Sequence, residues 1–87
     1  MRSIQFNPVA LKAFLNLTSN KAAFKRTTML LKEIMRDPAN GAGNPEPLKH
    51  QLSGLWSRRI NQKDRIIYSF DANTIYIYAI GGHYDDH

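Results

Sequence analysis

The sequence predicts a small α+β domain in which two helices pack on one face of an antiparallel sheet. Apolar residues recur at helical spacing in the first half of the chain, whereas β-branched and aromatic residues alternate with other residues in the last third. Short turns separate these later segments, and strands joined by short turns are antiparallel neighbours. We expect residues 1–87 to form a single domain, because a chain of this length builds one hydrophobic core.

A short strand and a helix are expected at the start of the chain. Ile4 and Phe6 alternate with polar residues, which is typical of a strand. Asn7 is a favourable N-cap, and Pro8 suits the first helical turn because its missing N–H would have no partner there. The first helix is therefore expected from Pro8 to about Thr18.

A second, amphipathic helix is expected from residue 21 to about residue 36, with Asn20 as its N-cap. Asp37 ends it, because the residue before a proline avoids the helical region. At about 100° per residue the apolar side chains gather on one side: Ala23, Phe24, Thr27, Leu30, Leu31 and Ile34. Four cations form a stripe on the other side: Lys21, Lys25, Lys32 and Arg36. The stripe is either a solvated surface or a contact for a nucleic-acid backbone, and spacing alone does not separate these interpretations.

The second half of the chain predicts a loop and then three strands. Residues 38–50 are rich in glycine and proline, so we expect a loop there. Prolines on both sides of Glu46 restrict the backbone and hold this carboxylate in an extended, exposed segment. The strands are expected over residues 55–60, 65–70 and 74–80, with turns at 61–64 and 71–73.

Composition limits the classes of protein to which the chain can belong. Twelve Lys and Arg residues against seven Asp and Glu residues give a net charge of +5, which favours a polyanionic partner if the cations cluster. The absence of cysteine excludes disulfides and thiolate metal sites. No stretch resembles a signal core or a membrane span, so we expect a cytoplasmic protein with no membrane contact.

Several charged side chains near the loop and strands have the chemistry that RNA cleavage requires. Transesterification needs a base for the 2′-hydroxyl proton, an acid for the leaving 5′-oxygen and cations around the phosphorus. Glu46, His50 and His83 supply proton-transfer groups, and Arg59 and Arg65 are close neighbours across a short turn. Arg58 is expected on the opposite face of the strand from Arg59. The histidines lack the spacing of a zinc motif, so we expect no metal.

Two blocks of residues and a C-terminal pair carry a family resemblance. They are Pro45-Glu46-Pro47-Leu48-Lys49-His50 with Leu52-Ser53-Gly54, then Trp56-Ser57-Arg58-Arg59-Ile60, followed by Arg65, Ile67-Tyr68 and the pair His83-Tyr84. In order and spacing they resemble the YoeB/Txe toxins of the RelE/ParE superfamily, densely from Gly41 to Tyr84. The resemblance implies a RelE-like fold: an N-terminal strand and two helices packed on one face of an antiparallel sheet completed by three C-terminal strands.

The resemblance also implies a function and a role for each site residue. It implies the toxin of a type II toxin–antitoxin system, which enters the ribosomal A site and cuts mRNA through a cyclic phosphate without metal or cofactor. Glu46 would be the general base, His83 the general acid and Arg65 the group that stabilises the transition state. Phosphate binding and substrate positioning would fall to Lys49, His50, Arg59 and Tyr84. The cationic stripe is not part of this resemblance: if it is more than a solvated surface, Lys21, Lys25, Lys32 and Arg36 would contact the ribosome.

Partners follow from the same resemblance. A cognate antitoxin, YefM/Axe-like, acidic and partly disordered, would cover the site, and the complex would repress its own operon through antitoxin–DNA contacts. Homodimer formation fits the behaviour of the family. Two alternatives stay open: a ParE-type toxin that binds DNA gyrase, and a catalytically inactive relative kept for antitoxin pairing and operon control. The set Glu46, Arg65 and His83 argues against the gyrase alternative, because gyrase poisons do not depend on it.

The chain departs from many relatives at both ends of this resemblance. Ala42 and Asn44 stand where family members often carry lysines, and Gly81-Gly82 stands where many carry larger residues. Asp85-Asp86-His87 extends the chain beyond His83-Tyr84, and we expect this extension to be a flexible tail.

Overall fold

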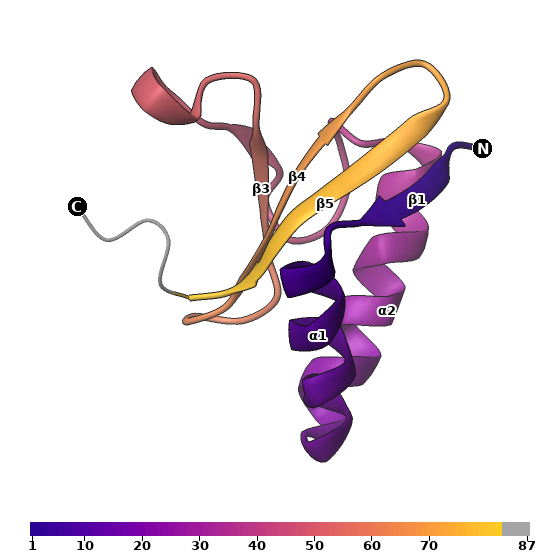
Figure 1. The fold of residues 1–87 in the computed structure, drawn as a ribbon, viewed down its shortest axis with the longest axis vertical. Helices are drawn as coiled ribbons and strands as arrows, with labels where there is room; N and C mark the ends of the chain where they lie inside the picture. The colour runs from indigo at the N-terminus through magenta and orange to yellow at the C-terminus, as the bar shows by residue number, and fades with distance from the viewer. Residues whose placement is uncertain (83–87) are drawn as a thin grey trace.

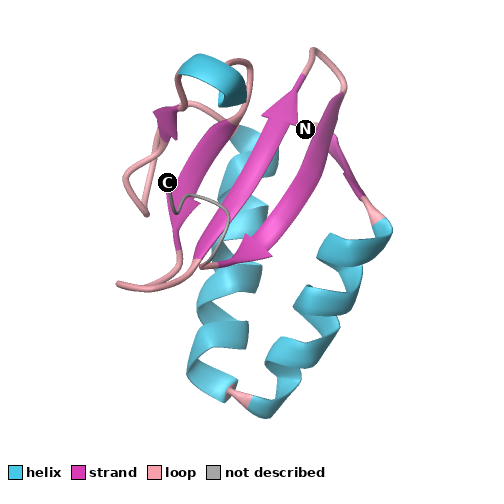
Figure 2. Ribbon diagram, turned by 60° about the vertical axis from the view of Figure 1, so that its left-hand side comes forward, coloured by secondary structure: helices cyan, strands magenta, loops and turns pink. Residues whose placement is uncertain are grey.

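A five-stranded sheet with two α-helices on one face is the architecture of the computed structural model, which describes residues 1–82 (Figure 1 and Figure 2). The elements are β1 (Ser3–Phe6), α1 (Pro8–Asn16), α2 (Lys21–Arg36), β2 (Glu46–Pro47), β3 (Trp56–Arg59), β4 (Arg65–Phe70) and β5 (Thr74–Gly81). Short 3-10 turns, η1 (Leu17–Ser19) and η2 (His50–Leu52), follow α1 and β2. The expected α+β class is confirmed. Within residues 1–82, neither helix has the length and apolar content that crossing a bilayer needs.

The sheet has the strand order β1-β5-β4-β3-β2 and is mixed. Strands β3, β4 and β5 pair antiparallel, as the short turns predicted, and β2 pairs antiparallel with β3. In contrast, β1 pairs parallel with β5, so that Ser3 lies opposite Thr74. No hairpin joins β1 to its neighbour, so turn length could not predict this direction. Strand β2 is also new: the sequence predicted only loop there, yet Glu46 and Pro47 pair with Ser57 and Trp56.

Both helices begin at the predicted asparagine caps. The side-chain oxygen of Asn7 accepts a hydrogen bond from the backbone N–H of Ala10 at 2.7 Å, and that of Asn20 accepts one from Ala23 at 3.1 Å. Helix α1 ends slightly before the expected Thr18, because its last turn tightens into η1. Helix α2 ends at Arg36 as predicted, where Asp37 becomes extended ahead of a proline.

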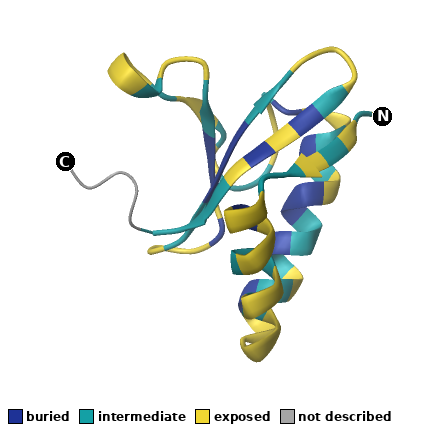
Figure 3. Ribbon diagram, viewed as in Figure 1, coloured by how far each residue is buried: buried dark blue, intermediate teal, exposed yellow. Residues whose placement is uncertain are grey.

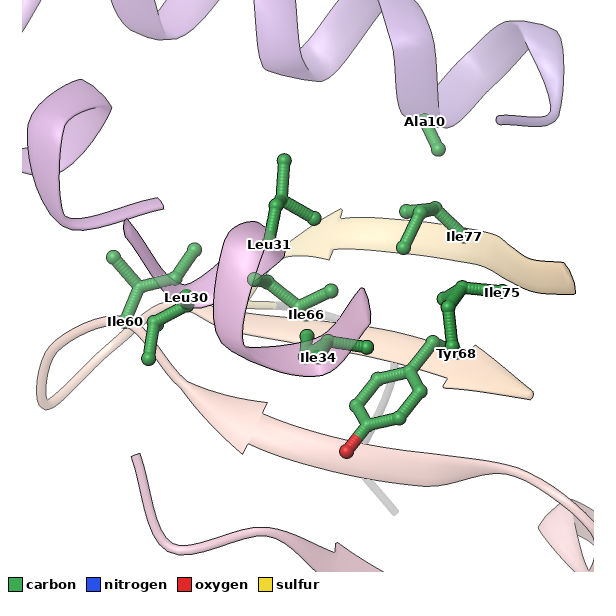
Figure 4. Close-up of a cluster of buried hydrophobic side chains, with 9 residues drawn as sticks. All are labelled: Ala10, Leu30, Leu31, Ile34, Ile60, Ile66, Tyr68, Ile75 and Ile77. Carbon is green, nitrogen blue, oxygen red and sulfur yellow. The ribbon is translucent and has the colours of Figure 1, made fainter. Parts of the chain in front are cut away.

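The hydrophobic core lies between the helices and the sheet (Figure 4). Its buried side chains come from both helices, from β4 and β5, and from the residue after β3: Ala10, Leu30, Leu31, Ile34, Ile60, Ile66, Tyr68, Ile75 and Ile77. Burying an aliphatic side chain of this size contributes about 1.5–3 kcal/mol before chain entropy is counted. Along β5, buried Ile75 and Ile77 alternate with exposed Tyr76 and Tyr78 (Figure 3). One face of the sheet is therefore packed against the two α-helices, and within residues 1–82 the other face carries no α-helix.

Candidate active site

The face of the sheet that carries no helix, which we call the open face, brings Glu46 beside β3 and β4. Glu46 lies opposite Ser57, and Ser57 lies opposite Ile67, so these three residues form one row across β2, β3 and β4. Side chains directly opposite one another share a face of a sheet. Glu46 is exposed, whereas Ser57 and Ile67 are buried. The carboxylate therefore stands at the accessible edge of the row.

Two arginines form the next row on the same face. Arg59 lies opposite Arg65, and Arg65 lies opposite Gly81. Because side chains alternate along a strand, residues two apart on β3 and β4 share a face, about 6.7 Å apart along the strand. Arg59 and Arg65 therefore adjoin the row that contains Glu46. The predicted proximity of the two arginines is confirmed, and a carboxylate and two cations share one surface.

Glu46 is held in position by a very short strand. The two prolines beside it restrict the backbone, and pairing with Ser57 and Trp56 fixes its register on β3. The backbone N–H of Leu48 donates to the carbonyl oxygen of Leu55 at 2.8 Å, which extends this pairing past β2. The predicted extended, exposed segment around Glu46 is confirmed.

Lys49 and His50 follow β2 in the connection to β3. Both side chains are exposed. His50 has a φ of 60°, a left-handed conformation that non-glycine residues rarely adopt, and it begins the η2 turn. Such strained positions concentrate at functional sites. Lys49 and His50 thus follow β2 in the chain and are not part of the sheet; His50 begins η2, the short helical turn that stands away from the sheet in Figure 1.

Arg58 lies on the opposite face from Arg59, as alternation predicted, and its side chain is fully buried there. One terminal nitrogen, Nη2, donates to the carbonyl oxygens of Asp37 and Asn40, both at 3.0 Å. The other, Nη1, lies 3.5 Å from Oε1 of Glu33. That same carboxylate oxygen accepts a hydrogen bond from the backbone N–H of Ala42 at 2.9 Å. Arg58 thereby ties the loop that precedes β2 to helix α2.

Close backbone packing holds the same loop against β3. The N–H of Arg59 donates to the carbonyl oxygen of Gly43 at 2.6 Å. A Cβ atom at Gly43 would meet Cγ of Arg58 at 2.7 Å and the carbonyl oxygen of Arg59 at 2.8 Å, and its φ of +85° also favours glycine. The Tyr68 hydroxyl donates to the carbonyl oxygen of Pro38 at 2.6 Å, and burial raises the pKa of this phenol.

The sequence alone did not predict that the contacts of Arg58, Gly43 and Tyr68 support the site. Alternation predicted that Arg58 would point away from Arg59, but it did not predict burial among backbone carbonyls. The signal available was the pair of glycines, Gly41 and Gly43, in a loop that must approach a strand closely. Together Arg58, Glu33 and Gly43 determine where β2, and hence Glu46, meets β3.

The cationic stripe of α2 is separate from this site. Lys21, Lys25, Lys32 and Arg36 are exposed. Helix α2 belongs to the layer that covers the other face of the sheet (Figure 2). Lys32 and Arg36 also border a cavity of about 700 Å³ with three methionines. The structure therefore does not bring the stripe together with Glu46, and a role for it in ribosome binding stays a prediction.

His83 and Tyr84, together with the predicted tail Asp85-Asp86-His87, lie outside the described residues. Gly81, the last residue of β5, lies opposite Arg65. Within residues 1–82, no three side chains of His, Cys, Asp or Glu are grouped so that they could hold a metal ion. The chemistry visible on the open face is therefore a carboxylate next to two guanidinium groups.

Solved structures with low sequence identity share this fold. YafQ from Escherichia coli has a TM-score of 0.78 at 13% identity, covering 95% of this chain and 94% of that one. The YoeB/ParE toxin from Agrobacterium tumefaciens has a TM-score of 0.87 at 24% identity, covering 94% and 99%. This chain therefore shares its α+β fold, with two helices on one side of the sheet, with both of these structures.

Closer relatives identify the family. Residues 6–84 match the family described as YoeB-like toxin of bacterial type II toxin-antitoxin system. Toxin RelK of Mycobacterium tuberculosis is 41% identical over 85 residues, covering 97% of this chain and 100% of that protein. A chain of the YoeB–YefM complex from Staphylococcus aureus has a TM-score of 0.86 at 40% identity, covering 97% and 99%. The chain belongs to the family of YoeB-like toxins of bacterial type II toxin–antitoxin systems.

Proposed function

We propose that this toxin is a ribosome-dependent endoribonuclease that cuts mRNA in the ribosomal A site and so inhibits translation. The observation that supports this most directly is the row geometry of the open face. Glu46 lies next to the row formed by Arg59 and Arg65, and all three belong to the sheet face that neither α-helix of the described chain covers. A base beside two phosphate-binding cations is the arrangement that phosphodiester transesterification needs.

In the proposed reaction the Glu46 carboxylate takes the proton of the RNA 2′-hydroxyl. The 2′-oxygen then bonds to phosphorus while the bond from phosphorus to the 5′-oxygen breaks, which leaves a 2′,3′-cyclic phosphate. His83 gives its proton to the departing 5′-oxygen. Arg65 stabilises the charge on the phosphoryl oxygens, because a guanidinium group is always charged and can bond two oxygens at once.

The remaining site residues bind and orient the RNA in this proposal. Arg59, Lys49 and His50 hold phosphate groups, and Tyr84 positions the substrate or the acid. No metal ion or cofactor takes part, so cleavage should persist when a chelator selective for transition metals is added. The reaction places the protein in the cytoplasm, where ribosomes translate mRNA.

A partner is part of the proposal. The S. aureus relative was solved as a YoeB–YefM complex, and another structure is described as a YoeB dimer, with a TM-score of 0.85 at 40% identity. We infer that this chain also pairs with an acidic, partly disordered antitoxin, which covers the open face and supplies the contacts to operator DNA. Homodimer formation is part of the same inference.

The decisive experiment incubates the purified protein with a defined mRNA, with and without programmed ribosomes, and maps new 5′ ends by primer extension. Cuts confined to A-site codons, and only in the presence of ribosomes, would support the proposal. A folded protein that binds its antitoxin but cuts nothing would overturn it. A DNA supercoiling assay would then separate a gyrase-binding toxin from an inactive relative.

A further inference from the structure

A trough runs between helix α2 and the turn that joins β3 to β4. It consists of two cavities of about 320 Å³ and about 240 Å³, and both are lined by Arg26, Ile60 and Asn61. The larger cavity extends past Asn44 to Arg59, which also belongs to the arginine row of the open face. We call this surface the α2 trough. It connects the face that carries Glu46 with the side of helix α2.

Arg26 is the central cation of the trough. It is half-buried, and its Nε donates to the carbonyl oxygen of Ile60 at 3.2 Å. This bond orients the guanidinium group, whose other donors make no further hydrogen bond or ion pair within residues 1–82. An arginine held by its Nε alone keeps its two terminal nitrogens available for an anion.

The rest of the lining is suited to the same kind of ligand. Arg59 is exposed, and its guanidinium group bonds to no other residue in the described part of the chain. No carboxylate is among the described residues that line either cavity. Asn44 and Gln62 add amide groups, which both donate and accept hydrogen bonds. Asn44 has a left-handed φ of 53°, a conformation uncommon outside functional or turn positions.

We propose that the α2 trough binds a phosphate of the RNA strand next to the one that is cut, with Arg26 as its ligand. The proposal rests on the function proposed above. An RNA strand fits better than an acidic peptide, because Arg59 is shared between the trough and the row that contains Arg65, so one continuous polyanion would reach both. Asn44 and Gln62 lie where they would meet the base or sugar of the adjoining nucleotide.

The test measures binding separately from cleavage. A Glu46→Gln background prevents cleavage, and affinity for a short oligouridylate is measured by fluorescence anisotropy between 50 and 200 mM salt. Losing one phosphate contact to single-stranded RNA lowers the slope of log affinity against log salt by about 0.7. Raising the salt from 50 to 200 mM weakens binding by some factor when Arg26 is present. In the Arg26→Gln variant we expect that factor to be about 2.6-fold smaller.

Two matched variants separate a phosphate contact from other effects. Arg26→Lys keeps the charge but changes the bond to Ile60, so it should retain the slope. Lys12→Gln also removes one positive charge, but from an exposed residue of α1 that lines neither cavity. The slope of log affinity against log salt should therefore stay nearly unchanged. Thermal melts of all variants check that the fold is kept.

Three results would overturn the proposal: an unchanged slope with Arg26→Gln, an equal change with Lys12→Gln, or a loss confined to binding of a polyglutamate probe. The last result would reassign the trough to an acidic protein partner. None of these measurements depends on cleavage. A wild-type protein that fails to cut mRNA would therefore refute the proposed endonuclease while leaving the RNA-binding result readable.

Discussion

Arg58 and Arg59 are neighbours on one strand with opposite environments. Arg58 is fully buried and bonds to two carbonyl oxygens, while Arg59 is exposed and its side chain bonds to nothing in the described part of the chain. The pleat of β3 sends one side chain toward α2 and the other to the open face. The comparison separates two uses of the same residue type: one arginine holds the site together, and the other presents its guanidinium group on the open face.

The largest effect is expected from substituting Glu46 on the open face, and it should appear in cleavage activity and not in stability. Glu46→Gln removes the proposed base, so cleavage on programmed ribosomes should fall about 100- to 10,000-fold, measured by primer extension. The melting temperature should not change, because Glu46 is exposed. Asp71→Asn, an exposed carboxylate at the β4–β5 turn, is the matched control and should cut normally. Equal activity of both variants would remove Glu46 from the mechanism.

The arginine pair itself gives the next largest effect. Arg58→Ala should lower the free energy of unfolding by about 3 kcal/mol, since it opens a cavity and removes two partly buried hydrogen bonds to carbonyl oxygens. Arg59→Ala should change it by less than about 0.5 kcal/mol while weakening RNA binding. Urea denaturation of both variants checks this. A comparable loss of stability in both would show that the two arginines do not differ as described.

Glycine at position 43 tests how closely the loop must approach β3. Gly43→Ala should destabilise by about 2 kcal/mol, because the new Cβ collides with Arg58 and with the backbone. Gly54→Ala is a sharp control: Gly54 also has a positive φ, +95°, but nothing lies within 4 Å of the added atom. It should cost only about 1 kcal/mol of backbone strain. Denaturation midpoints that do not separate the two variants would contradict the close approach.

The smallest effect concerns the Tyr68 hydroxyl. Tyr68→Phe removes a buried hydrogen bond to Pro38 and should cost about 1 kcal/mol at neutral pH. Burial raises the pKa of Tyr68, so the folded state holds its proton more tightly than the unfolded state does. This contribution to stability is complete below the ordinary value of 10.0 and is lost as pH rises above it. The wild type should therefore lose more stability than Tyr68→Phe in denaturation above pH 10.

Local chemistry made much of the fold predictable. Asn7 and Asn20 cap their helices as expected, and the turns between the last three strands gave the right antiparallel order. Features set by distant contacts were not predictable. The parallel pairing of β1 depends on β5, which lies at the other end of the chain, and the irregularity between Ile67 and Tyr68 leaves no clear pattern in the sequence.

For the site, as for the fold, local features were predictable and contacts between distant residues were not. Proline restriction and strand alternation placed Glu46, Arg59 and Arg65 correctly on exposed or neighbouring positions. Alternation says which way a side chain points but not what it meets, so the contacts of Arg58 required the structure. The trough at Arg26 was missed for the same reason, because it is formed by residues of a helix, a loop and a turn.

The pairing of β1 with β5 has a consequence for how the toxin is made. Ser3 finds its partner only when Thr74 is available, so the sheet closes after nearly all of the described chain has been synthesised. Contacts between such distant residues form late, because the loop between them must close first. A nascent chain from which β5 has not yet emerged therefore lacks the finished sheet. The folded form of this toxin thus depends on a segment that is synthesised long after β1.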